Sequence, residues 1–270
     1  MFAKGWIAVL LAGISAAALA SGQGSTSSVD RISAELTGPS GQEESISVVR
    51  ETALRETAST LGARAGLHDR SCELAEVLRK RSEDMDRQFR FNSLMMGRGM
   101  LPPVISEARD AVLMERNVMR IASRAYRIDE PAMLVDVPPT WRNWMYVGLT
   151  VESCDKPFKI PEVAHQLRPQ NDKERAFFNS VLQASYKAGR EQAQQVFDAN
   201  LARLVRTYQG MRRYFELYER GMVSAPVLIS ETEVVAMDDP NTLLVGNTVI
   251  RITAGAAFVQ KPEQWKPLAQ

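Results

Sequence analysis

The sequence has few of the side chains that most often carry catalysis or bind metal ions. Its 270 residues include only two histidines, His68 and His165, and only two cysteines, Cys72 and Cys154. Neither histidine belongs to an HExxH motif, and the cysteines stand too far apart in the chain to form a CxxC pair. We therefore expect no metal site, no cofactor and no catalytic histidine.

The short motifs of common nucleotide-binding and hydrolytic enzymes are also absent. The sequence contains no GxSxG nucleophile elbow and no GxxxxGK[ST] phosphate loop. Gly97-Arg98-Gly99 is too short for a dinucleotide-binding motif and follows a predicted helix, so we interpret it as a helix stop. Adjacent acids such as Asp238-Asp239 are typical of solvated turns. We expect no enzyme; the rival, a periplasmic hydrolase, would need acidic or histidine side chains gathered in a concave pocket.

Neither sign of charge is in surplus. The 33 basic residues face 32 acidic ones, which leaves a net charge of +1. Binding to nucleic acid needs a basic excess or a concentrated basic face, because the phosphates carry the affinity. We therefore expect no direct nucleic-acid binding.

Long apolar runs are missing except at the N-terminus. Lys4 precedes the apolar run Trp6–Leu19, and Ala18-Leu19-Ala20 matches the small-x-small pattern of signal peptidase sites. We predict a signal peptide over residues 1–20; an uncleaved membrane anchor is the alternative. Export to an oxidising periplasm would allow Cys72 and Cys154 to form a disulfide, and two buried free thiols are the alternative.

The pattern along the mature chain predicts an α+β fold with one main domain. Residues 21–42 are rich in Ser, Gly, Thr and Gln, which favours a flexible leader. Residues 43–259 form the expected domain, and residues 260–270 an irregular tail. Within the domain, apolar spacing predicts helices over about 43–61 and 69–96, a small β region over 104–136, a long helix over 171–221 and strands over 227–236 and 243–253.

Glycines, prolines and caps predict where several of these elements end. Gly62 and Gly66 are expected to separate the first two helices, and Gly189 and Gly210 to bend the long one. Asn171 with Glu174 favours a capped start of the long helix. Gly246-Asn247 is typical of a two-residue hairpin turn. Val118–Ile128 has apolar residues on both faces, which favours a strand covered on both sides, although its Ala and Arg content leaves a helix open.

The long helix and a nearby tryptophan pair are the best candidates for contact with a partner. A helix of about fifty residues would extend roughly 75 Å, which is longer than a small domain is wide. Part of its apolar stripe would then lack cover within the chain, although the stripe could instead pack onto the two N-terminal helices. The candidate interaction residues are Trp141, Arg142, Trp144, Phe197, Leu201, Tyr208 and Met211.

Several ordered blocks of the sequence carry a resemblance to a known family. They include Leu101-Pro102-Pro103-Val104-Ile105, Pro138-Pro139-Thr140-Trp141-Arg142, Glu191 through Phe197, Met222-Val223-Ser224-Ala225-Pro226 and Val249 through Ala254. In these blocks the chain resembles the DotC family, called TraI in IncI plasmid conjugation systems. The resemblance extends from about Val48 to Phe258, nearly the whole mature chain.

The resemblance implies a structural role and not a reaction. DotC-like proteins belong to the outer-membrane core complex of Dot/Icm type IVB secretion systems. With a DotD-like lipoprotein, they help a DotH-like channel subunit reach the outer membrane in a hetero-oligomeric ring. The resemblance therefore implies a periplasmic protein associated with the outer membrane of a Gram-negative bacterium. The alternative is a periplasmic binding or cell-wall-associated module without channel function.

The sequence departs from the family pattern at the end of the predicted signal peptide. DotC proteins are usually lipoproteins, whereas Ala20-Ser21 offers no acceptor cysteine. We therefore expect partners, and not a lipid of its own, to hold this chain at the outer membrane.

Overall fold

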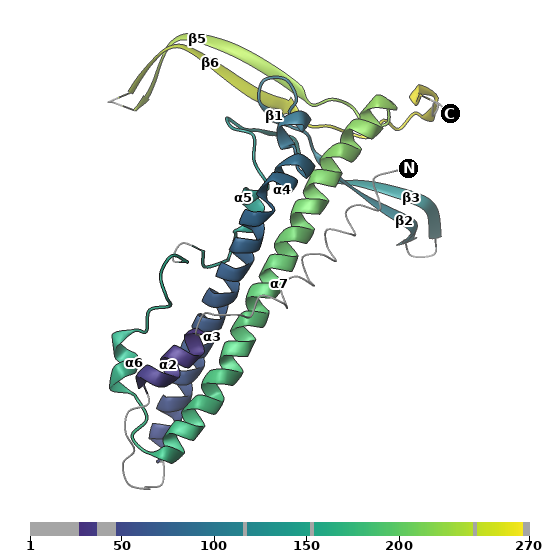
Figure 1. Cartoon of the computed structure of the whole chain (residues 1–270). Helices are drawn as coiled ribbons and strands as arrows, with labels where there is room; N and C mark the ends of the chain where they lie inside the picture. Colours follow the sequence, from purple (N-terminus) through teal and green to yellow (C-terminus); the bar gives the residue numbers. More distant parts are fainter. Residues whose placement is uncertain (1–26, 37–46, 116–117, 152–153, 240–241, 267–270) are drawn as a thin grey trace. The chain divides into compact units, whose positions relative to one another are not determined.

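The chain folds into helices and antiparallel hairpins, as the α+β prediction required (Figure 1). The computed structural model describes residues 27–36, 47–115, 118–151, 154–239 and 242–266. The chain forms two compact units, Met1–Asp86 with Arg142–Leu201, and Arg87–Trp141 with Ala202–Gln270. The domain expected over residues 43–259 includes parts of both units.

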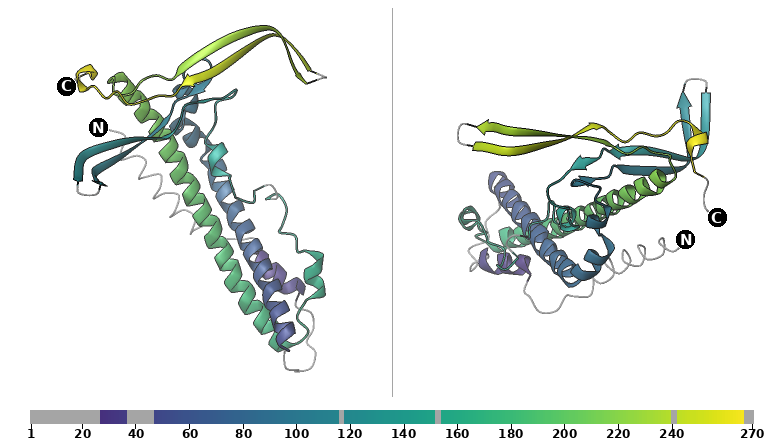
Figure 2. Two further views of the ribbon diagram at one scale, coloured as in Figure 1. Left: turned by 180° about the vertical axis from the view of Figure 1, so that it is seen from behind. Right: turned by 90° about the horizontal axis from the view of Figure 1, so that it is seen from above.

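The first unit is helical. Its elements are α2 (Ser28–Leu36), α3 (Val48–Lys80), most of α4 (Ser82–Gln88), α5 (Arg142–Met145), α6 (Glu162–Gln166) and the first part of α7 (Asp172–Glu219). Within this unit α3 and α7 lie side by side, which can be followed from the front and from behind (Figures 1 and 2).

The predicted break at Gly62 and Gly66 is wrong, because α3 continues through both positions. A Cβ added to Gly62 would overlap the carbonyl oxygen of Leu182, and one on Gly66 would overlap that of Tyr186. From the other side, Gly189 of α7 approaches the carbonyl oxygen of Ala63 in the same way. These glycines weaken the isolated helices, but they let the two backbones approach more closely than side chains would permit.

α2 lies within the stretch that we predicted to be a flexible leader, so the structure differs from the expectation there. Ile32 and Leu36 stand four positions apart on one face of α2 and are fully buried. They join a core formed with α3, α6 and α7, whose buried members are Ile32, Leu36, Leu54, Ala58, Leu61, Ala65, Ile160, Ala164, Phe178 and Leu182. Two large apolar residues at helical spacing, with the partly buried Val29, therefore dock an otherwise polar segment.

The start of α7 is capped as predicted. The Asn171 side-chain oxygen accepts a hydrogen bond from the backbone N–H of Glu174 at 2.8 Å. The Glu174 carboxylate accepts from the backbone N–H of Gln170 at 2.8 Å and from the guanidinium of Arg50 in α3. From this cap the helix runs for 48 residues without interruption at Gly189 or Gly210.

The second unit contains hairpins and short helical turns. Each sheet among the described residues is an antiparallel pair: β1 (Met100–Leu101) with β4 (Met133–Leu134), β2 (Val104–Glu115) with β3 (Val118–Glu130), and β5 (Val227–Asp239) with β6 (Thr242–Ala254). The 3₁₀ turns are η1 (Phe91–Leu94) and η2 (Pro262–Gln264). The predicted strand regions are confirmed.

Two details of the predicted strands are wrong. Asn247 lies within β6, opposite Glu233, so Gly246-Asn247 is not the hairpin turn. The strands are instead joined through residues 240–241, which lie outside the described residues; Pro240 cannot donate a ladder hydrogen bond and therefore favours the end of a strand. In β3 the side chain of Ile121 is 72% exposed, so this strand is not covered on both faces.

The second part of α7 packs against the beginning of β2. Gly210 approaches the backbone of Ile105, and the guanidinium of Arg213 donates to the Ile105 carbonyl at 2.8 Å. Ile105 belongs to a buried cluster with Tyr214, Leu217 and Val223. The close approach at Gly210 fixes where the β2–β3 hairpin leaves the helix.

Candidate functional site

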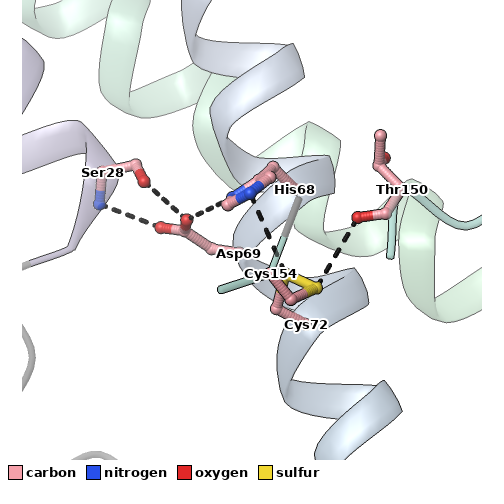
Figure 3. Close-up of a disulfide and its surroundings, with 6 residues drawn as sticks. All are labelled: Ser28, His68, Asp69, Cys72, Thr150 and Cys154. Carbon is pink, nitrogen blue, oxygen red and sulfur yellow. Dashed lines mark hydrogen bonds and ion pairs between the residues drawn. A yellow bond between two sulfur atoms is a disulfide. The ribbon is translucent and has the colours of Figure 1, made fainter. Parts of the chain in front are cut away.

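A disulfide joins α3 to the segment between α5 and α6 (Figure 3). The sulfur atoms of Cys72 and Cys154 are bonded at 2.08 Å, and their Cα atoms are 5.4 Å apart. The sequence had left this pairing open. Because the two cysteines are separated by 82 positions, the bond closes a long loop. This loop contains Arg87–Trp141, which belongs to the second unit.

His68 lies one turn before Cys72 and contacts groups on both sides of its ring. Its Nε2 is 3.9 Å from the sulfur of Cys72, and its Nδ1 is 3.2 Å from a carboxylate oxygen of Asp69. The ring also meets the Phe158 ring edge-on, at 5.8 Å between centroids. His68 is only 8% exposed, so these neighbours surround its ring in the protein interior.

The Asp69 carboxylate connects three helices. It accepts hydrogen bonds from the backbone N–H and hydroxyl of Ser28 in α2, at 2.9 and 2.5 Å, and from the hydroxyl of Tyr186 in α7, at 2.8 Å. Burial raises the pKa of Asp69, but the hydrogen bonds from Ser28, His68 and Tyr186 outweigh it and hold the pKa below its usual value. Burial and the Asp69 charge raise the pKa of Tyr186 to about 12.

One turn further along α3, Glu73 forms a second link to α7. The Arg190 guanidinium donates to both carboxylate oxygens of Glu73, at 2.7 and 2.9 Å, and Arg70 donates to the same carboxylate at 2.7 Å. Arg70 also donates to the side-chain oxygen of Gln194 in α7 at 2.6 Å. Burial raises the pKa of Glu73, but the two guanidinium groups together lower it below its usual value.

These groups form a mechanical link and not an assembly aimed at a ligand. Each charged group named above already contacts an opposite charge or a hydrogen-bond donor of the same unit. Among the residues that the structure describes, no three His, Cys, Asp or Glu side chains gather in a way that could hold a metal ion. What the arrangement can do chemically is lock α2, α3 and α7 together beside a covalent bond.

Most of the predicted interaction residues lie in the interior of the chain. Trp141, Phe197, Leu201 and Met211 are buried, with Phe197 fully inaccessible. A partner could reach these four side chains only if the chain opened, so in this structure the long apolar stripe serves the chain's own core. The sequence had predicted the stripe but could not tell what covers it.

The other three predicted residues are more accessible. Arg142 is exposed and donates to Asp86 at 2.9 Å. Trp144 is half-buried. Tyr208 is half-buried and meets the rings of Phe89 and Phe91 edge-on, at 5.4 and 5.2 Å.

The surface that sequence reasoning missed lies on the hairpins. Val112 and Ile121 on the β2–β3 hairpin are 54% and 72% exposed, and Val227 and Ile229 on β5 are 51% and 44% exposed. Both regions were predicted as strands, but Val118–Ile128 was expected to be covered on both sides, so the prediction pointed away from this surface. These hairpins carry large apolar side chains that the described part of the chain leaves uncovered.

A comparison with protein families finds a match over most of the chain. The model of the TraI family, described as type IV secretory system, conjugal DNA-protein transfer, matches residues 48–267. The chain belongs to this family. The TraI-family match begins at the first residue of α3 and ends just after η2, so it spans both units. The sequence resemblance to the DotC/TraI family is thereby confirmed.

As a TraI-family protein, the chain is a component of a type IV secretion or conjugation system. A search of the curated proteins finds no match. No described helix is both long enough and apolar enough to cross a membrane. The predicted signal peptide, residues 1–20, lies outside the described residues.

Proposed function

We propose that this TraI-family chain is a structural subunit of the outer-membrane core complex of a type IVB secretion or conjugation system. In this role it assists the placement of a DotH-like channel subunit at the outer membrane, together with a DotD-like lipoprotein. The observation that carries the proposal is the family match over residues 48–267, which includes α3, α7 and both long hairpins. The proposal includes no chemical reaction.

The construction of the helical unit supports a scaffolding role. Close glycine packing, two groups of half-buried polar links and a disulfide hold α3 against its neighbours. A unit fastened in this way keeps its surface in one arrangement, which is what a subunit that positions another protein requires. The disulfide also agrees with a periplasmic location, since such bonds persist in oxidising compartments.

We further propose that partners hold the chain at the outer membrane. The two cysteines of the sequence are bonded to each other, so neither sulfur is open to a lipid in this structure. Attachment would then depend on protein contacts with the DotD-like and DotH-like subunits.

Cell fractionation tests this attachment. In a strain that lacks the DotD-like and DotH-like subunits, the chain should be recovered in the soluble periplasmic fraction, whereas in the intact strain it should sediment with the outer membrane. Restoring both partners from a plasmid is the control. Persistent association with the outer membrane in their absence would reject the proposed attachment.

A second experiment tests whether this chain assists the placement of the DotH-like subunit. Deleting the gene for this chain should leave the DotH-like subunit outside the outer-membrane fraction and abolish transfer. A point variant that unfolds only this chain should reproduce the deletion. If the DotH-like subunit reaches the outer membrane normally without this chain, the placement role is wrong even though the family assignment stands.

A further inference from the structure

The two long hairpins of the second unit have open strand edges. Each belongs to a sheet of only two strands among the described residues, so every strand pairs along one edge only. The strands are long, with 13 residues in each of β3, β5 and β6. Two-stranded hairpins are marginally stable in water, and an unpaired edge is a template for another strand.

The middle of β3 is basic, because Arg127 pairs with Asp129 at 2.7 Å near the acidic end of the strand and leaves Arg120 and Arg124 as the basic stretch. Arg120, Arg124 and Arg127 are all exposed along this strand. Arg124 lies directly opposite Arg109 of β2, and like charges at opposed positions destabilise a hairpin. The acid nearby, Glu107, is shared, because it lies 3.8 Å from Arg124 and 3.4 Å from Arg213. An acidic strand beside β3 would relieve this repulsion.

The strand β5 has the opposite character. Its sequence contains Glu231, Glu233, Asp238 and Asp239 and neither lysine nor arginine. The Glu231 side chain is 60% exposed, and its ion pair with Arg251 of β6 is a long one at 3.8 Å. β5 therefore has the same length as β3 and an acidic charge that complements the basic stretch from Arg120 to Arg124.

We propose that β3 of one copy of this chain pairs with β5 of a second copy. Two basic stretches around Arg120 and Arg124 repel each other, as do two acidic β5 strands, so complementary charge selects the mixed pair. The contact is between different surfaces of the two copies and leaves one free edge of each kind. It can therefore continue from copy to copy and close into a ring.

The charges favour one antiparallel register. When Arg124 lies opposite Glu231, position 233 falls diagonally between positions 120 and 124 on the same face of the sheet. In the same register Ser123 lies directly opposite Thr232. A parallel arrangement with Arg124 beside Glu231 would place Arg120 next to the apolar Val227, so it satisfies fewer charges.

Cysteine cross-linking tests the register in the full-length chain. A mixture of the Ser123→Cys and Thr232→Cys variants should form a disulfide-linked dimer under mild oxidation, because directly opposed residues have Cβ atoms within disulfide reach. The matched control replaces Thr232→Cys by Thr253→Cys on β6, which should link at least tenfold less. Equal cross-linking of Ser123→Cys with Thr232→Cys and with Thr253→Cys, or no cross-linking in either mixture, would overturn the proposal.

Charge reversal tests the pairing in solution by sedimentation. Arg120→Glu/Arg124→Glu alone and Glu231→Arg/Glu233→Arg alone should each weaken self-association by about tenfold or more, as the loss of two favourable pairs implies. An equimolar mixture of the two variants should associate again, since each then offers the edge that the other needs. Arg64→Glu/Arg203→Glu, at exposed helical sites, is the control with the same charge change as the β3 variant and should associate normally.

Each other outcome counts against the proposal. A wild-type chain that stays monomeric, or reversed variants that associate unchanged, would contradict it directly. Pairing of β3 with β5 inside one chain would contradict it too, and would appear as an internal link in a Ser123→Cys/Thr232→Cys chain with no dimer in the mixture. These tests use the purified chain alone, so they are independent of the placement role.

Discussion

Gly66 in α3 lies against the backbone carbonyl of Tyr186 in α7, at a position where a side chain would overlap the oxygen. Gly62 and Gly189 make the same kind of contact one turn before it and from the opposite helix. Each glycine lowers the helix propensity of its own helix, and each allows close backbone packing along the α3–α7 contact. At the scale of single residues, this contact depends on the absence of a side chain at these three glycines.

Gly66→Ala separates these two effects. In an exposed helix the change would stabilise the protein by about 1 kcal/mol, because alanine is the better helix former. Here we expect a loss of about 1–3 kcal/mol, as is typical of overpacking, since the helices must move apart. Thermal unfolding measures the sign. Gly97→Ala is the control, because nothing lies within 4 Å of a Cβ at that position; a Gly66→Ala protein that melts at or above the wild-type temperature would contradict the close contact.

Among the elements, α3 carries most of the links in the first unit. It holds Asp69 and Glu73, which reach α2 and α7, and Cys72, which reaches the segment after α5. The polar links and the covalent bond fall within two turns of the helix. This short stretch therefore fastens segments that are distant in sequence.

Replacing both cysteines with serine tests the covalent part of this fastening. The disulfide closes a loop spanning 82 positions, and the chain-entropy model predicts a loss of about 4–5 kcal/mol in unfolding free energy when it is removed. Denaturant unfolding with and without a reducing agent measures it. The wild type under reducing conditions should approach the stability of the Cys72→Ser/Cys154→Ser variant, which should itself be insensitive to the reductant. A double variant as stable as the oxidised wild type would show that the bond contributes little.

At the scale of the whole molecule, several carboxylates have a pKa below the ordinary value. For Glu174 the main cause is the hydrogen bond from Arg50. For Asp69, hydrogen bonds outweigh burial, and for Glu73, hydrogen bonds and arginine charges outweigh it. A lowered folded-state pKa means that the ionised group stabilises the fold above its unfolded pKa. That contribution is present above about pH 4.5, the ordinary value for glutamate, and is lost as the pH falls further.

The expected result is a melting temperature that is nearly constant near neutral pH and falls below about pH 4.5. Glu174→Gln should lower the melting temperature at pH 7, because hydrogen bonds to a charged group contribute about 1.5–3 kcal/mol. The difference from the wild type should shrink in acid. Glu51→Gln, which removes an exposed carboxylate paired with Arg55, is the control and should change stability by under about 1 kcal/mol. An unchanged gap between Glu174→Gln and wild type down to pH 3 would contradict the ionic role of Glu174.

The sequence by itself determined the features that depend on neighbours in the chain. Apolar spacing and the Asn171 cap predicted α7, strand-like apolar segments predicted the strand regions of both hairpins, and ordered blocks identified the family. These signals are local, because periodicity and capping involve residues a few positions apart.

Only the tertiary structure decided what each element meets. Local propensity predicted a break at Gly62 and Gly66, yet close packing against α7 keeps α3 continuous. The stripe residue Phe197 was a candidate for a partner, and the chain itself covers it. The pairing of Cys72 with Cys154 and the open edges of β3 and β5 likewise follow from contacts between distant segments. Such contacts depend on which surfaces approach each other in space, and the spacing of residues along the chain does not specify those surfaces.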